Sequence, residues 1–168
     1  RGSPAIGREY RLLHEWVENY QDLLFDLLSD RYILFGEWMF NKHTIYYDQL
    51  PDYFFESDIY DKLSDAWLST NKRKELLNKF NFIKQVPVIA AFKPSGLSQI
   101  TNLVGKSIYR SPSWKEQLKL KCAFVRADFD KILSETDKTD FMEGLYIKHE
   151  DNDCVLNRYK FVRYDFLQ

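Results

Sequence analysis

The strongest pattern in the sequence lies near its beginning. Between Glu9 and Leu28, nine apolar or aromatic side chains recur at steps of three and four residues. This spacing places them on one face, so we expect an amphipathic helix over 9–28. Ser29 and Asp30 end it, and Arg31–Phe40, which is rich in aromatic and β-branched residues, follows as a predicted strand.

The rest of the chain mixes short predicted strands with short predicted helices. We expect a helix over 70–80 capped by Ser69 or Thr70, and a helix that starts at a Ser111 cap, continues past 122 and carries Trp114, Leu118 and Cys122. Further helices are expected over 95–105 and 127–134, and strands over 53–60, 86–91, 142–149 and 154–163. The last two strands flank an acidic turn and should form a hairpin. The order favours an α+β fold with largely antiparallel sheets and flanking helices. With 168 residues and 45% apolar side chains, one domain over 1–168 can form its own core.

Composition excludes several classes of protein. No stretch of about 20 apolar residues could span a bilayer, so we expect a soluble protein without a membrane partner. Cys122 and Cys154 stand alone, and together with three scattered histidines they make no zinc pattern. Two unpaired thiols and the lack of a signal peptide favour the cytoplasm, although one disulfide stays open.

The charge is balanced overall and uneven locally. A net charge of −1 argues against a protein that coats nucleic acid by bulk electrostatics. Residues 48–65 contain six acids and one base, whereas residues 106–126 contain six bases and one acid. Two solvated faces are the ordinary interpretation of this contrast. A basic surface for phosphates over 106–126 is the alternative.

Glu37 breaks the pattern of the first predicted strand. Alternation puts it on one face with Ile33, Phe35 and Met39, and the other face is equally apolar, so we expect a strand buried on both sides. A carboxylate in that row must meet a cation, a ligand or water in a cleft. A structural ion pair and a ligand site both remain open.

The final hairpin carries a second unusual set of charges. Arg158 and Lys160 share one face of the last strand, which suggests a phosphate between them or a solvated edge. Glu143 begins the preceding strand, and Gly144 after it lets another backbone or a ligand approach closely. An acid near two cations can bind Mg²⁺ beside a phosphate. Strict alternation separates Glu143 from Lys148, so a shared site requires a bulge at 143–144.

Taken in order, five segments resemble the covalent nucleotidyltransferase superfamily, and within it the ATP-dependent RNA ligase family in its bacterial and phage form. They are Arg1-Gly2, Phe35-Gly36-Glu37-Trp38, Tyr53–Ile59, Met142–Lys148 and Arg158-Tyr159-Lys160. The resemblance implies a nucleotidyltransferase (ATP-grasp-like) catalytic domain. Such an enzyme uses ATP and Mg²⁺ or Mn²⁺ to seal RNA 5′-phosphate and 3′-hydroxyl ends through lysyl-AMP and adenylylated-RNA intermediates.

The resemblance also implies roles for particular residues. Glu37 matches the acid that binds the adenosine ribose, and Glu143 matches the acid that engages the metal. Arg158 and Lys160 match the basic pair on the phosphate. Lys148 matches the lysine that closes the Glu-Gly motif.

Two further positions concern the nucleotide. Arg1 matches the arginine of the motif just after the nucleophile. Ser57 stands where some relatives have an aromatic ring that stacks on adenine, and Phe55, on the same face by alternation, is expected to replace it. We expect the acids at 37 and 143 and the paired cations to line a common crevice.

Other departures from the family pattern keep alternatives open. The nucleophilic Lys-x-x-Gly of the family precedes the Arg-Gly motif, so we expect it upstream of Arg1 and expect the printed chain not to adenylylate itself. Lys93-Pro94-Ser95-Gly96 has the spacing but the wrong order, and we interpret it as a loop. Arg158 stands where lysine is frequent. A catalytically incomplete nucleotide- or RNA-binding module remains an alternative, as does a DNA ligase or capping nucleotidyltransferase.

Overall fold

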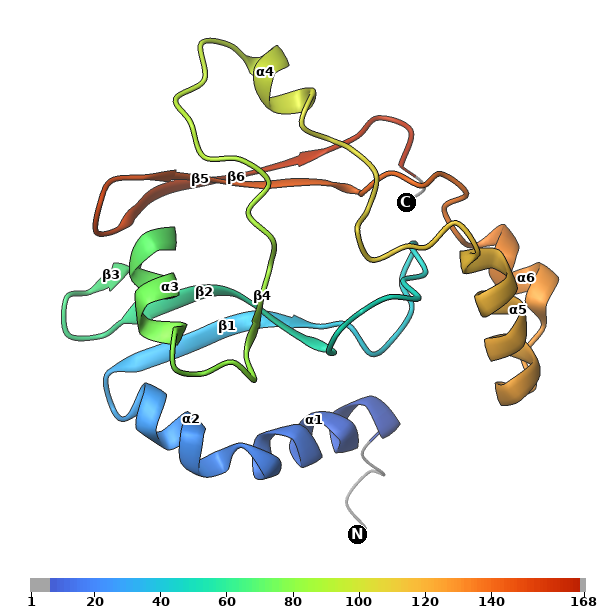
Figure 1. Ribbon diagram of the computed structural model, residues 1–168, viewed down its shortest axis with the longest axis horizontal. Helices are drawn as coiled ribbons and strands as arrows, with labels where there is room; N and C mark the ends of the chain where they lie inside the picture. The colour runs from blue at the N-terminus through green and yellow to red at the C-terminus, as the bar shows by residue number, and fades with distance from the viewer. Residues whose placement is uncertain (1–6, 167–168) are drawn as a thin grey trace, which may run out of the picture. The chain divides into compact units, whose positions relative to one another are not determined.

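The computed structural model describes residues 7–166, which form a mixed fold of helices and mainly antiparallel strands (Figure 1). Backbone contacts divide the chain into two compact units. Unit 1 comprises the chain up to Asn41 together with Asp52–Val86 and Lys148–Asn157. Unit 2 comprises Lys42–Pro51, Pro87–Ile147 and the chain from Arg158 onward. The α+β class expected from the sequence agrees with these elements.

Unit 1 begins with two helices rather than the single helix predicted over 9–28. α1 (Arg8–Asn19) and α2 (Gln21–Leu28) meet at Tyr20, whose φ of −116° and ψ of 15° leave the helical region. The ring of Tyr20 stacks on Phe82 with centroids 4.2 Å apart. The break allows Trp16 of α1 and Leu24 of α2 to pack on the same core, so the apolar periodicity was interpreted correctly and the continuity was not.

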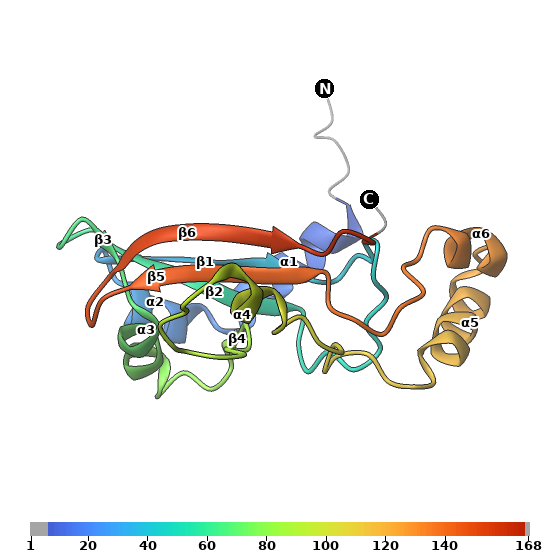
Figure 2. The ribbon, with the colours of Figure 1, turned by 90° about the horizontal axis from the view of Figure 1, so that it is seen from above.

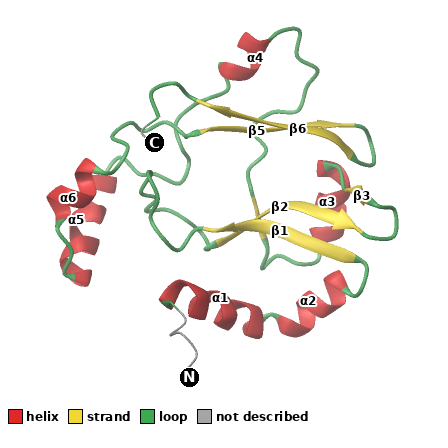
Figure 3. Cartoon of the chain, turned by 180° about the vertical axis from the view of Figure 1, so that it is seen from behind, coloured by secondary structure: helices red, strands yellow, loops and turns green. Residues whose placement is uncertain are grey.

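A small sheet forms the centre of unit 1. β1 (Tyr32–Trp38) pairs antiparallel with β2 (Phe54–Asp61), and β2 also pairs antiparallel with β3 (Ala66–Trp67) and parallel with β4 (Lys84–Gln85). Its buried core consists of Leu27, Ile59, Leu77 and Ile83. Figure 3 shows α1 and α2 running along β1 and β2.

β1 is covered on one face, so the expected burial on both sides is wrong. Tyr32 and Leu34 pack against the core, whereas Ile33, Phe35 and Glu37 alternate with them and are exposed. Within unit 1 the two helices supply apolar contacts to one face of the sheet. Glu37 is therefore a solvent-accessible carboxylate rather than a buried one.

A bulge interrupts the pairing of β1 with β2. Phe35 lies opposite Asp58 and Gly36 lies opposite Glu56, so the register skips Ser57. A Cβ atom on Gly36 would lie 2.4 Å from the carbonyl oxygen of Phe55. Any other residue would clash there, so the position requires glycine. The bulge ends the strict alternation along β2 and turns one backbone carbonyl out of the ladder.

The predicted hairpin is confirmed as β5 (Gly144–Glu150) and β6 (Val155–Val162), which run side by side in Figure 2. Its tip is fastened to the start of α3 (Thr70–Leu77) inside unit 1. The amide of Ser69 donates to the Asp153 carbonyl at 2.9 Å, and the Thr70 hydroxyl donates to Glu150 at 2.8 Å. Of the two predicted caps, Ser69 is the N-cap of α3, since its hydroxyl accepts from the Lys72 amide.

Unit 2 packs two helices around the core that the sequence predicts. α5 (Trp114–Val125) buries Trp114, Leu118 and Cys122, and α6 (Phe129–Ser134) packs beside it (Figure 2). The cap of α5 is Ser113 rather than Ser111. The amide and hydroxyl of Ser111 instead bind the Asp48 carboxylate.

Two predicted elements between β4 and α5 are wrong or shortened. The strand expected over 86–91 has no regular structure, and the helix expected over 95–105 is reduced to α4 (Leu97–Thr101), which buries no residue. Pro87 and Pro94 lack amide donors, so this segment cannot complete a hydrogen-bonded ladder. Its apolar side chains, including Val88, Ile89 and Leu97, are exposed, and apolar periodicity therefore misled the prediction.

Candidate functional site

The face of the unit 1 sheet that carries Glu37 holds the first group of predicted residues. Glu37 of β1 lies directly opposite Phe55 of β2. Phe55 is buried, while Phe35 on the same face is exposed and packs against Trp67 at 4.9 Å between ring centroids. Within residues 7–166 no salt bridge involves Glu37, so the structural ion pair considered from sequence is not found there.

Lys148 is held by β2 at the bulge. Its Nζ lies 3.0 Å from Oδ1 of Asp58 and also donates to the carbonyl of Ser57. The side chains of Lys148 and Asp58 are only 10% and 8% exposed. Burial, and then the positive charge of Arg73, lower the pKa of Lys148, while the hydrogen bond and charge of Asp58 act in the opposite direction. Lys148 is therefore a fixed, partly desolvated cation.

Ser57 takes part through its backbone. Its carbonyl accepts from Lys148 and, at 2.7 Å, from Nη1 of Arg73. The same Arg73 nitrogen lies 2.5 Å from Glu56, which is fully buried. Two cations thus converge on the carbonyl that the bulge releases from the ladder.

The acid-rich segment 48–65 is not a solvated face throughout. Glu56, Asp58 and Asp61 of β2 are all buried, and each has a cationic partner. The partner of Asp61 is Arg31, whose guanidinium holds the pKa of that carboxyl well below its usual range. The sequence did contain a signal, because three acids in one strand require cations from elsewhere in the chain.

The second group of predicted residues lies in unit 2, at the base of the hairpin. Nζ of Lys160 in β6 lies 2.8 Å from Oε1 of Glu143, just before β5, and the side chains are 68% and 39% exposed. A Cβ atom on Gly144 would lie 1.9 Å from the carbonyl oxygen of Phe161, which confirms the predicted close backbone approach. Because the backbones of β5 and β6 approach closely at Gly144, the neighbouring Glu143 and Lys160 side chains lie within ion-pair distance.

Arg163, which sequence reasoning did not select, holds the backbone around Glu143. Its Nε donates to the Met142 carbonyl and its amide donates to the Glu143 carbonyl, both at 3.0 Å. Its guanidinium also pairs with the buried carboxylate of Asp137. Burial raises the pKa of Asp137, but hydrogen bonds from Thr139 and Arg163 outweigh it, so the pKa is lowered overall.

The remaining predicted positions can be placed briefly. Arg158 is half-buried in β6, two residues before Lys160. Lys93-Pro94-Ser95-Gly96 is a loop, as expected. Arg1 lies outside the described residues. Cys122 and Cys154 are both free thiols, so the open alternative of one disulfide is not found.

Comparison with known families decides the assignment. A family model described as RNA ligase matches residues 3–162. The chain belongs to the RNA ligase family. Neither a curated protein nor a solved structure matches it. The family resemblance of the motifs is confirmed, and RNA is the substrate that membership in an RNA ligase family implies.

The potential metal ligands of this RNA ligase family member are scattered within residues 7–166. No cluster of three or more His, Cys, Asp or Glu side chains there is arranged to hold an ion. Glu143 supplies one exposed carboxylate, which fits Mg²⁺, since that ion commonly takes one or two protein carboxylates and completes its shell with phosphate oxygens and water. In the same part of the chain, every helix is too short or too polar to cross a membrane.

Proposed function

We propose that this protein is an ATP-dependent RNA ligase domain with a nucleotidyltransferase fold. Its substrates would be RNA 5′-phosphate and 3′-hydroxyl ends, with ATP and Mg²⁺ or Mn²⁺ as cofactors. Membership in the RNA ligase family supports this, and so does the chemistry of the two residue groups described above. The free thiols suit a reducing compartment, and we propose the cytoplasm.

The unit 1 group is proposed to bind the nucleoside. Glu37 is exposed and has no salt bridge within residues 7–166, so its carboxylate is available to accept hydrogen bonds from ribose hydroxyls. Phe55 is the ring expected to lie against adenine, but it is only 4% exposed, so the exposed Phe35 on the same face is proposed to supply that contact. Lys148 keeps a fixed positive charge next to this face because Asp58 and the Ser57 carbonyl hold it.

The unit 2 group is proposed to bind phosphate and metal. Lys160 and Arg158 supply positive charge for phosphate oxygens, and Glu143 supplies the carboxylate for the metal. A bound Mg²⁺ would neutralise charge that develops on the phosphoryl oxygens during AMP transfer. Arg163 and Gly144 maintain the backbone from which Glu143 projects.

The proposed reaction has three phosphoryl transfers. A lysine in a Lys-x-x-Gly motif attacks the α-phosphate of ATP and releases pyrophosphate, the RNA 5′-phosphate then takes the AMP, and the 3′-hydroxyl finally displaces AMP to join the strands. Positioning and charge neutralisation supply most of the catalysis in such transfers. The residues described here would contribute both.

The observation that carries this proposal is the Glu143–Lys160 pair. Both side chains are solvent-accessible, and an exposed ion pair contributes only about 0–1 kcal/mol, so a nucleotide and a metal can replace each partner at little cost. Glu143 and Lys160, which belong to separate sequence motifs, therefore form an ion pair whose partners a metal and a phosphate can replace.

Isothermal titration of the 168-residue chain with ATP, with and without Mg²⁺, tests the proposal. We expect Mg²⁺ to strengthen ATP binding, and Glu143→Gln to remove that increment while leaving the metal-free affinity unchanged. Glu18→Gln, an exposed acid on α1, is the matched control and should behave as the original chain. Absence of ATP binding, or an equal Mg²⁺ effect in Glu143→Gln, would refute the assignment.

A further inference from the structure

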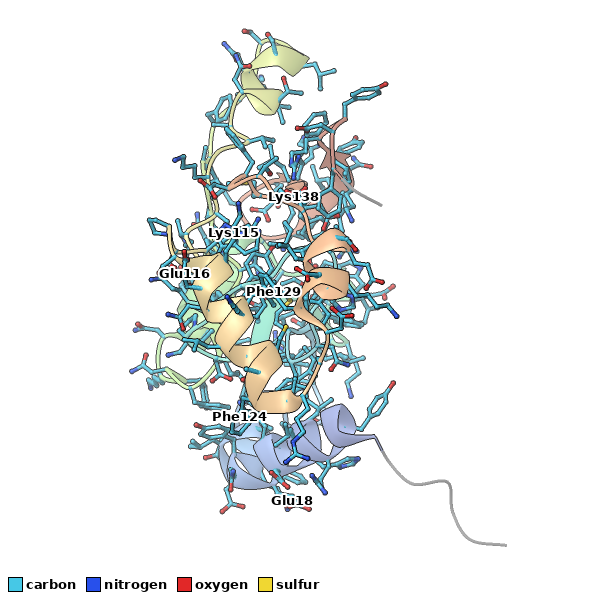
Figure 4. The ribbon with its side chains drawn as sticks, turned by 90° about the vertical axis from the view of Figure 1, so that its right-hand side faces the viewer. Glu18, Lys115, Glu116, Phe124, Phe129 and Lys138 are labelled. Carbon is cyan, nitrogen blue, oxygen red and sulfur yellow. The ribbon has the colours of Figure 1, made fainter. Side chains whose placement is uncertain are left out.

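The outer face of α5 carries apolar side chains that its core packing does not use. Trp114, Leu118 and Cys122 point inward at steps of four residues. Leu120 and Phe124 also follow a four-residue step, on the opposite side of the helix, and Phe124 is 80% exposed. Figure 4 shows Phe124 near one end of α5, with Lys115 and Glu116 near the other.

Basic side chains flank this apolar stripe. At 100° per residue, Lys119 falls on one side of Leu120 and Phe124, and Lys121 falls on the other. Arg126 adds positive charge at the C-terminal end of the helix. Lys115, in the first turn, lies toward the core-facing side, with its Nζ 5.4 Å from the centroid of the buried Trp114 ring. All four cations are exposed. Within residues 7–166 none of the four belongs to a salt bridge.

The charged side chains of α5 are therefore mostly positive and exposed. Its single acid, Glu116, lies in the first turn, where a carboxylate interacts favourably with the helix dipole. Nζ of Lys121 lies 5.8 Å from the centroid of the Phe124 ring, so a cation already neighbours the most exposed aromatic of the helix. An open aromatic ring between unneutralised cations has the chemistry of a platform for a base and its phosphates.

We propose that the outer face of α5 binds a single-stranded segment of RNA. Lys119, Lys121 and Arg126 contact phosphates, and Phe124 stacks on one unpaired base. The choice of RNA as the polynucleotide rests on the proposed function. Of the six bases in 106–126, Lys106 pairs with Asp140 and Arg110 is buried, so the exposed positive charge of this segment lies on and beside α5, where it complements the phosphates of a polynucleotide.

The stacking and charge contributions make different predictions for binding. Base–aromatic stacking contributes about 1–3 kcal/mol per base, so Phe124→Ala should weaken binding of single-stranded RNA between about 5- and 140-fold. It should leave the salt dependence unchanged. Lys119→Ala combined with Lys121→Ala should reduce the slope of log affinity against log salt by about 1.4, at about 0.7 per phosphate.

The test uses the full 168-residue chain and a fluorescein-labelled single-stranded RNA of about 12 nucleotides, followed by fluorescence anisotropy at several salt concentrations. Phe25→Ala is the matched aromatic control, because Phe25 is 70% exposed on α2 beside acidic residues. Lys62→Ala combined with Lys79→Ala is the matched charge control. Thermal denaturation verifies that each variant is folded, and both controls should bind RNA like the unmodified chain.

Three outcomes would overturn the proposal. One is a chain that does not bind the RNA, and another is a Phe124→Ala variant with unchanged affinity. The third is a homodimer, seen by light scattering, that Phe124→Ala dissociates without changing RNA affinity, which would assign the surface to a second copy. Since anisotropy requires neither ATP nor AMP transfer, failure of the Mg²⁺–ATP experiment would leave this test standing, and Phe124→Ala should bind ATP normally.

Discussion

The ion pair between Asp58 and Lys148 provides the sharpest test of how the site is held. Both side chains are about nine-tenths buried, with Nζ and Oδ1 3.0 Å apart. Asp58→Asn keeps the shape of the side chain and removes its charge. In this variant Lys148 stays buried without the negative charge of Asp58. The Ser57 carbonyl still accepts its hydrogen bond, and Arg73 is a like charge nearby.

The expected loss of stability follows from this burial. Removing one partner of a buried ion pair costs about 3–5 kcal/mol, and we expect about 3 kcal/mol because the Ser57 carbonyl still accepts from Lys148. The effect should depend on pH. The pKa of Lys148 in the folded chain already lies below its ordinary value of 10.5, and loss of Asp58 lowers it further.

The destabilisation caused by Asp58→Asn should decrease as pH rises. A lysine whose pKa is lowered by folding destabilises the fold most where it is charged, and this penalty decreases as pH rises toward 10.5. The difference in unfolding free energy between Asp58→Asn and the original chain should therefore be largest near neutral pH and smaller at alkaline pH. Urea denaturation at both pH values measures this difference.

The control is Asp26→Asn, the same chemical change at an exposed position of α2. It should alter the unfolding free energy by less than about 0.5 kcal/mol at both pH values. If Asp58→Asn were equally harmless, or if its cost were the same at neutral and alkaline pH, Lys148 would not depend on Asp58 for its charge.

Two further substitutions test the backbone that carries Glu143. Gly144→Ala places a Cβ atom 1.9 Å from the Phe161 carbonyl oxygen and should lower Tm by about 5–10 °C. Gly96→Ala is the control, because a Cβ atom there would have no atom within 4 Å and should leave Tm unchanged. Equal Tm values for the two variants would contradict the close approach. Arg163→Met leaves the buried Asp137 carboxylate unpaired and should cost about 3–5 kcal/mol in urea denaturation, with the exposed Tyr164→Ala as its control. A cost no larger than that of Tyr164→Ala would show that Arg163 does not hold this segment.

Local periodicity predicted much of the fold. The strands at 31–40 and 53–60, the hairpin and the buried face of α5 all depend on alternation or helical spacing within a few residues. The same reasoning failed where tertiary packing decides. Val88 and Ile89 are apolar but exposed between two prolines, and no pairing strand reaches them. Tyr20 fits a continuous helix by periodicity and still ends one.

The candidate site shows the same division. Gly144 could be recognised because a glycine beside an acid in a strand has a local meaning, namely close backbone approach. Asp58 and Arg163 could not be selected, because their partners lie 90 and 26 residues away and no local pattern joins them. The three buried acids of β2 indicated that cations from distant parts of the chain pack against this strand. Interpreting 48–65 as a solvated face led away from that conclusion.

Lys148 of β5 and Lys160 of β6 differ in how far their side chains are exposed. Lys160 exchanges its partner Glu143 at a cost of about 0–1 kcal/mol, because both side chains meet water. Lys148 would lose about 3–5 kcal/mol on leaving Asp58, because both side chains are buried. On the proposed function, a ligand phosphate would therefore recruit Lys160 directly, whereas Lys148 would act from its fixed position as a charge held by β2. The Ser57 bulge is what makes that position possible, since it frees the carbonyl that Lys148 and Arg73 share.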